Sequence, residues 1–178
     1  MSFRENSKAF TLIELLVVVA IIGILAAVGV VAYNGYTSAA KKNAAKSNHT
    51  NVLKFISSEM QKCEILGYVQ LKSSIGNPSR INNVTCDSQG QTTRDMALVF
   101  NVHFQNIGFK NPYDSKEYGT TCNLNPSYNN ICFYKGVVKG QVIISITGSN
   151  VPFGNTFRIT TKISDSETLT ADFDDPRY

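Results

Sequence analysis

Few side chains in this sequence have the type and spacing that catalysis requires. The two histidines, His49 and His103, have no acid or nucleophile motif near them in the sequence, and His49 is expected to face solvent on a helix. The sequence also lacks a phosphate-binding loop, a dinucleotide fingerprint and a metal-binding helix motif. We therefore expect a protein that is not an enzyme and that has no catalytic or cofactor-binding residues.

Charged side chains are distributed unevenly along the chain. The formal net charge of +4 is too small and too dispersed to favour nucleic acid as a partner. Lysines dominate residues 41–62, whereas acidic residues dominate the end of the chain, where Asp172, Asp174 and Asp175 lie close together. These carboxylates lack the spacing of a calcium loop, so we interpret them as a solvated acidic tail and not as a metal site.

The cysteines are the residues best suited to covalent bonds. There are four, Cys63, Cys86, Cys122 and Cys132, and they lack the close spacing of zinc ligands. Three pairings are possible, and we favour Cys63 with Cys86 and Cys122 with Cys132 because these are nearest neighbours along the chain. Such bonds require an oxidising compartment, and four buried free thiols are the alternative.

Glu14 interrupts an apolar run that extends from Leu12 to Ala32. The run has about the length of a helix that crosses a bilayer, and a carboxylate inside such a helix costs about 2.5–3.5 kcal/mol. Either Glu14 has a functional role, or it lies close enough to the helix end to reach interfacial water. Arg4 and Lys8 precede the run, which favours a cytoplasmic flank and an outward-facing remainder.

The residues around the start of this run form a specific motif. The small residue Ala9 precedes the run, whereas in an ordinary secretory signal the small-residue cleavage site follows a shorter apolar core. The residues Lys8-Ala9-Phe10-Thr11-Leu12-Ile13-Glu14-Leu15-Leu16, with the apolar stretch that follows, closely resemble the prepilin signature of type IV pilins and pseudopilins. The resemblance covers residues 8–36, and beyond them only the general architecture is similar.

This resemblance implies a processing step and a function. A prepilin peptidase would remove residues 1–9 as a leader by cutting between Ala9 and Phe10, and would methylate the new amine of Phe10. Glu14 occupies the fifth mature position, which is that of the assembly glutamate. The implied product is a structural subunit of a type IV pilus, held in the inner membrane as a precursor and then polymerised into an extracellular filament for adhesion, motility or DNA uptake. Its implied partners are other pilin subunits, the peptidase, the pilus assembly platform and its ATPase.

Two other interpretations remain open. A type II secretion pseudopilin or a minor pilin would share the first segment, although the cysteines argue mildly against a pseudopilin because a surface fibre gains more from covalent bonds. A membrane-anchored enzyme or binding module would account only for the anchor.

A single long helix is predicted over residues 10–66, of which residues 10–32 form the hydrophobic transmembrane and assembly segment. The sequence has no proline in this range, and Gly67 is suited to a C-cap. At the usual rise per residue the helix would be about 80 Å long. Its second half carries an apolar stripe at helical spacing, formed by Val52, Phe55, Ile56, Met60, Cys63 and Leu66.

Residues 67–178 are predicted to form a globular α+β domain, the pilin fold, in which an antiparallel sheet packs against the long helix. Residues 67–91 are interpreted as a connecting loop because Ser, Asn, Gly and Thr are frequent there. Residues 96–104 fit both a strand and a helix, and we favour a short helix with Asp95 as its N-cap and Gly108 as its end.

The C-terminal part has the alternation that is typical of strands. Four strands are predicted, at residues 131–138, 141–147, 156–163 and 168–173, and their short connections favour antiparallel pairing. In the third strand one face is expected to be buried (Phe157, Ile159, Thr161 and Ile163) and the other to be solvent-facing (Arg158, Thr160 and Lys162). A turn is predicted over residues 111–114 from its proline and Asx residues.

Overall fold

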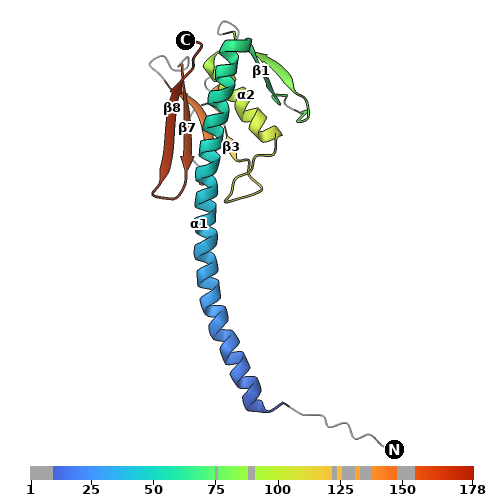
Figure 1. Cartoon of the computed structure of the whole chain (residues 1–178), viewed down its shortest axis with the longest axis vertical. Helices are drawn as coiled ribbons and strands as arrows, with labels where there is room; N and C mark the ends of the chain where they lie inside the picture. Colours follow the sequence, from blue (N-terminus) through green and yellow to red (C-terminus); the bar gives the residue numbers. More distant parts are fainter. Residues whose placement is uncertain are drawn as a thin grey trace, which may run out of the picture. The chain divides into compact units, whose positions relative to one another are not determined.

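The computed structural model describes residues 10–74, 76–87, 91–121, 124–125, 131–132, 138–147 and 155–178. The chain divides into two compact units, the N-terminal unit (Met1–Ala40) and the C-terminal unit (Lys41–Tyr178). The elements, labelled in Figure 1 where space allows, are α1 (Leu12–Leu66), β1 (Tyr68–Leu71), β2 (Asn82–Thr85), α2 (Thr93–Asn106), β3 (Thr120–Thr121), β4 (Leu124–Asn125), β5 (Ile131–Cys132), β6 (Val142–Thr147), β7 (Thr156–Lys162) and β8 (Thr168–Asp174). The predicted combination of a long first helix and a later antiparallel sheet is confirmed.

Helix α1 ends where its sequence predicts. Gly67 follows the last helical residue with a φ of 74°, a left-handed conformation that glycine adopts without strain. Its N–H donates to the carbonyl of Cys63 at 2.9 Å. The predicted apolar stripe is buried as far as Cys63, but the assignment of Leu66 to it was wrong, since this side chain is 57% exposed. The chain turns away at Gly67, and strand β1 supplies the next buried side chains.

The prediction of a loop over residues 67–91 was also wrong, because this segment contains strands β1 and β2. They pair antiparallel and form a separate two-stranded sheet. Val69, Leu71 and Val84 are buried in the main hydrophobic cluster. Each strand has only four residues and one or two buried apolar side chains. Such a short alternation is difficult to recognise in a sequence where the neighbouring residues are polar.

Helix α2 is longer than predicted and begins at a different cap. The N-cap is Thr92, and Asp95 is the third residue of the helix in a reciprocal capping box, so the assignment of Asp95 as N-cap was wrong. The Thr92 hydroxyl accepts from the Asp95 N–H, and the Asp95 carboxylate accepts from the Thr92 N–H at 3.0 Å. Gly108, with a φ of 78°, follows the end of α2 as predicted.

The main sheet has the order β3-β6-β7-β8. Strands β6, β7 and β8 are antiparallel neighbours as predicted, with Ile144 opposite Ile159 and Ile159 opposite Ala171. The short strand β3 was not predicted and pairs parallel with β6, which the long connection between these two strands permits. The strand predicted at residues 131–138 appears as the short β5, which pairs with β4 in another sheet, while residues 133–137 lie outside the described residues.

The core of the C-terminal unit lies between the sheet and two helices. Phe100 of α2, Ile56 of α1 and Phe157 of β7 are all fully buried in one cluster, and α2 lies beside the second half of α1 in Figure 1. The buried face predicted for β7 is confirmed, but Thr160, expected to face water, is only 5% exposed. It lies opposite Ile143, which is 1% exposed, so the second face of the sheet is also covered at this point.

Candidate functional site

The start of α1 is organised by two residues of the predicted processing and assembly motif. The Glu14 carboxylate accepts hydrogen bonds from the N–H and the hydroxyl of Thr11, at 2.8 and 2.7 Å, through the same oxygen. In return the Thr11 hydroxyl accepts from the Glu14 N–H at 3.3 Å. This reciprocal arrangement is a capping box, which satisfies N–H groups that have no partner within the helix. The role of Thr11 was missed, although the Thr-x-x-Glu spacing in the sequence signals it.

The side chains that follow are apolar and exposed. Within the N-terminal unit Phe10 is 83% exposed and Val18, the least exposed large apolar residue of the segment, is still 48% exposed. The helix is long and apolar enough to cross a membrane, and none of its most hydropathic stretch is buried. Glu14 is the only Asp, Glu, Lys or Arg residue of the sequence between Leu12 and Ala40. Ala9, on the other side of the predicted cleavage site, lies outside the described residues.

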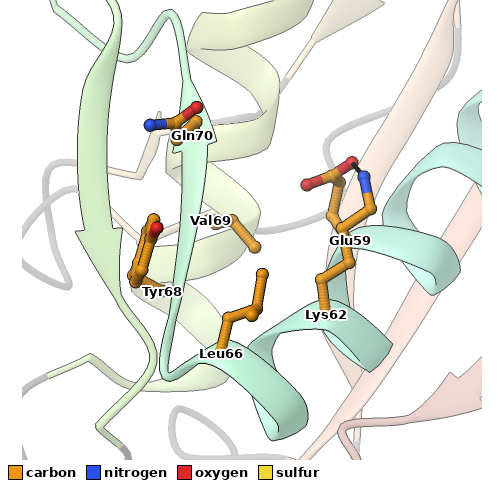
Figure 2. A pocket seen from close by; sticks show the side chains of 6 residues that line it. All are labelled: Glu59, Lys62, Leu66, Tyr68, Val69 and Gln70. Atoms are coloured by element: carbon orange, nitrogen blue, oxygen red, sulfur yellow. Dashed lines mark hydrogen bonds and ion pairs between the residues drawn. The ribbon is translucent and has the colours of Figure 1, made fainter.

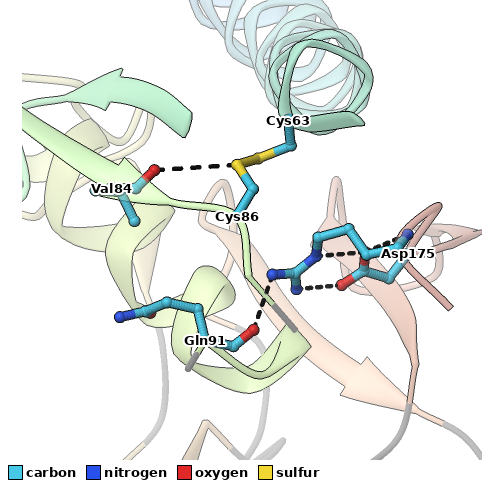
Figure 3. The surroundings of a disulfide bond; sticks show 6 residues. Cys63, Val84, Cys86, Gln91 and Asp175 are labelled. Carbon is cyan, nitrogen blue, oxygen red and sulfur yellow. Dashed lines mark hydrogen bonds and ion pairs between the residues drawn. A yellow bond between two sulfur atoms is a disulfide. The ribbon is translucent and has the colours of Figure 1, made fainter. Parts of the chain in front are cut away.

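One of the two predicted disulfides is present. Cys63 and Cys86 are bonded, with their Cα atoms 5.4 Å apart, and thereby join the last turns of α1 to the end of β2 (Figure 3). The Cys86 N–H also donates to the carbonyl of Gly67 at 2.9 Å. The second predicted bond falls outside the described part of the chain, which contains neither Cys122 nor the side chain of Cys132.

The two histidines pack inside the C-terminal unit, where His49 is buried and His103 is half-buried. His49 is 7% exposed, so its predicted solvent-facing position was wrong. Its Nδ1 lies 3.1 Å from the hydroxyl of Thr161 on β7, and burial lowers its pKa. The Nδ1 atom of His103 accepts from the Lys72 N–H at 3.0 Å, its ring stacks on Phe55, and its pKa is lowered chiefly by burial.

The three aspartates at the end of the chain have separate partners. Asp172 forms an ion pair with Arg158, and Asp174 accepts from the Thr156 hydroxyl at 2.8 Å. Asp175 is only 2% exposed, so the interpretation of all three as a solvated tail was wrong for this residue. Among the described residues no group of three or more His, Cys, Asp or Glu side chains is placed to hold a metal ion.

Similarity to known proteins agrees with this arrangement. Residues 4–30 match the family model described as the prokaryotic N-terminal methylation motif. The chain is 35% identical over 96 residues to the type IV major fimbrial protein FimA of Dichelobacter nodosus, a match that covers 49% of this chain and 59% of the relative. No solved structure is significantly similar to the chain.

The chain thus combines the methylation motif, an exposed apolar first helix and an α+β layout. Together with the similarity to a fimbrial protein over part of both chains, these features support a type IV pilin.

Proposed function

We propose that this chain is the precursor of a structural subunit of a type IV pilus. In this proposal residues 1–9 are a leader, which a prepilin peptidase removes between Ala9 and Phe10 before it methylates the Phe10 amine. Residues 10–32 hold the subunit in the inner membrane and then join neighbouring subunits in the filament. Residues 67–178 form the head domain on the outside of the filament. The assembly platform and its ATPase supply the work of extraction.

The observation that carries this proposal is the uncovered apolar segment of α1. Its large side chains are between 48% and 77% exposed from Leu12 to Val31, which a soluble monomer does not tolerate over so many consecutive residues. A bilayer covers such a segment completely before assembly. Helices of neighbouring subunits can cover it afterwards, so the same surface serves both states.

Glu14 favours one axial register between neighbouring subunits. Cleavage after Ala9 would create a positively charged amine on Phe10, about one helical turn before Glu14. An unpaired carboxylate and an unpaired amine in an apolar environment each carry a large desolvation cost, and pairing them removes part of both costs. Because Glu14 is the sole charged side chain of the segment, a neighbour's amine finds its partner at one axial position only.

The test is the substitution Glu14→Val in a strain that lacks the native subunit. We expect the variant to be exported and cleaved normally. Its filament yield should fall at least about tenfold, because a loss of about 1.4 kcal/mol in the free energy of each subunit contact weakens that contact by a factor of ten. Immunoblots of membrane pools and sheared filaments measure assembly, and intact-mass analysis reports cleavage and methylation.

Glu117→Val is the matched control. Glu117 lies in the C-terminal unit, is exposed, and forms no ion pair with the described residues, so its substitution should leave filament yield unchanged. Abundant filaments from processed Glu14→Val protein would remove Glu14 from the assembly mechanism. An absence of filaments from the unmodified chain, with the protein retained in the membrane, would contradict the pilus function itself. Short filaments that never reach the surface would instead favour the secretion pseudopilin.

A further inference from the structure

The second half of α1 carries its charges in two blocks. Residues 41–54 contain four lysines and no acidic residue, whereas residues 55–66 contain two glutamates and one lysine. Within the described residues Lys46 is the one lysine of the first block that forms an ion pair, with Glu167 at 2.6 Å. Two parallel copies in the same axial register would therefore place lysines beside lysines, and an axial offset removes this repulsion.

A cavity of about 290 Å³ lies beside the second block, where α1 ends and β1 begins. Figure 2 shows its lining, which consists of Glu59, Lys62, Leu66, Tyr68, Val69 and Gln70. One oxygen of the Glu59 carboxylate accepts from the Lys62 ammonium, and the other has no hydrogen bond within the described residues. The cavity thus combines a nearly buried carboxylate with apolar walls.

We propose that this cavity receives the Lys41 side chain of a second copy of the chain, which lies further along the filament than the copy whose Phe10 amine meets Glu14, and so sets the axial offset of that more distant neighbour. The inference rests on the proposed polymerisation into a filament. A lysine suits the cavity because its aliphatic stem can lie along Leu66 and Val69 while its ammonium reaches the unoccupied oxygen of Glu59. The ring of Tyr68, 39% exposed, offers a further favourable contact for a cation.

The charge around the cavity favours a cation even though Lys62 is present. Glu59 and Lys62 neutralise each other, but α1 ends nearby without a basic residue in its last turn. The carbonyl groups at this helix end carry partial negative charge, which the incoming ammonium would offset.

Lys41 is the lysine best placed to reach a neighbour's cavity. It is exposed and forms no ion pair with the described residues. About 27 Å of helix separates it from Glu59, so parallel copies offset by about this distance would bring the two residues together. The same offset brings Lys46 of one copy to the level of Glu64 of the next, and it places Lys54 beyond the end of the neighbour's α1.

The first test is acetylation of lysines in the unmodified protein, compared between sheared filaments and full-length protein in detergent. We expect Lys41 to be modified about tenfold less in filaments, with little change at Lys54, which is exposed on the same helix. Equal modification of Lys41 in both states would overturn the proposal. That result would not contradict the proposed pilus function, which is supported by the presence of the filaments themselves.

The second test is a designed cross-link in filaments. The double variant Lys41→Cys/Gln70→Cys should give a ladder of covalent oligomers on a non-reducing gel after mild oxidation. The control Lys54→Cys/Gln70→Cys should remain monomeric, and each single variant serves to check assembly. Normal filaments that yield only monomers from the Lys41 pair, or equal ladders from both pairs, would overturn the proposed contact.

Discussion

Two arginine–aspartate pairs of the C-terminal unit have similar geometry but very different burial, and this difference predicts the outcome of mutation. In the buried pair, the side chains of Arg177 and Asp175 are 5% and 0% exposed. Arg177 donates from its backbone N–H and from its guanidinium to Asp175, and also donates to the carbonyl of Gln91 at 2.8 Å. The Thr93 hydroxyl donates to the same carboxylate at 2.8 Å. Figure 3 shows Asp175 and Gln91 of this cluster near the disulfide.

The substitution Arg177→Ala would leave the Asp175 carboxylate buried without a counter-charge. Breaking a buried pair from one side costs about 3–5 kcal/mol of unfolding free energy. In the second pair, Arg158 and Asp172 are 43% and 38% exposed, although their two hydrogen bonds, at 2.8 and 2.6 Å, are equally short. An exposed pair contributes at most about 1 kcal/mol, so Arg158→Ala should be a mild change.

Urea unfolding of a fragment that begins at Gly35, monitored by circular dichroism, measures the free energy of unfolding of both variants. We expect the Arg177→Ala variant to lose at least about 2 kcal/mol more than the Arg158→Ala variant. The double variant Asp175→Leu/Arg177→Met should recover much of the loss, because replacing both members of a buried pair by apolar residues is often neutral. Equal losses for the two single variants would refute the argument from burial.

Further predictions concern the cysteines, the helix and the histidines. The cysteines of both predicted disulfides should resist alkylation when no reductant is present, and peptides that link Cys63 to Cys122 would contradict the pairing. Removal of the Cys63–Cys86 bond, which spans 23 residues, should lower the free energy of unfolding by about 3 kcal/mol. The fragment that begins at Gly35 should sediment as a soluble monomer while the mature chain needs detergent, and strong aggregation of the fragment would contradict this. Burial lowers the pKa of His49 and of His103, so the unfolded chain binds protons first as the pH falls. Stability should therefore be fully present above about pH 6.5 and decline below it, by at most about 1.4 kcal/mol per pH unit for each histidine, and a His49→Asn variant should show a shallower decline in pH-dependent urea unfolding.

Local signals in the sequence were sufficient for much of this fold. The end of α1 follows from Gly67, and three of the four predicted strands occur within about two residues of their expected ends because alternation is a local property. The capping residue of α2 was misassigned by one turn because Thr92 and Asp95 are both good caps, and only the geometry shows that they act together.

Contacts between distant segments were not predictable in the same way. His49 lies on a polar stretch of α1, and its burial depends on Thr161, which is 112 residues away in the chain. The environment of Asp175 depends on Thr93, 82 residues away. Neither pair has a local signature, so a polar residue in the sequence could not be recognised as buried until the sheet and the helices were assembled.

The remaining question is whether Glu14 acts through its charge or through its capping box, and the geometry at the start of α1 separates the two. Thr11→Val removes the hydroxyl that bonds to the Glu14 carboxylate and N–H, but it keeps the charge. Loss of a cap costs about 1 kcal/mol, whereas a carboxylate left without its cationic partner in an apolar environment costs more. Glu14→Gln does the reverse, since glutamine can still close a capping box but carries no charge. We therefore expect sheared-filament yields to remain near normal for Thr11→Val and to fall as far for Glu14→Gln as for Glu14→Val. Normal filaments from Glu14→Gln, together with a defect in Thr11→Val, would assign Glu14 to the helix start and leave the charge without a role in assembly.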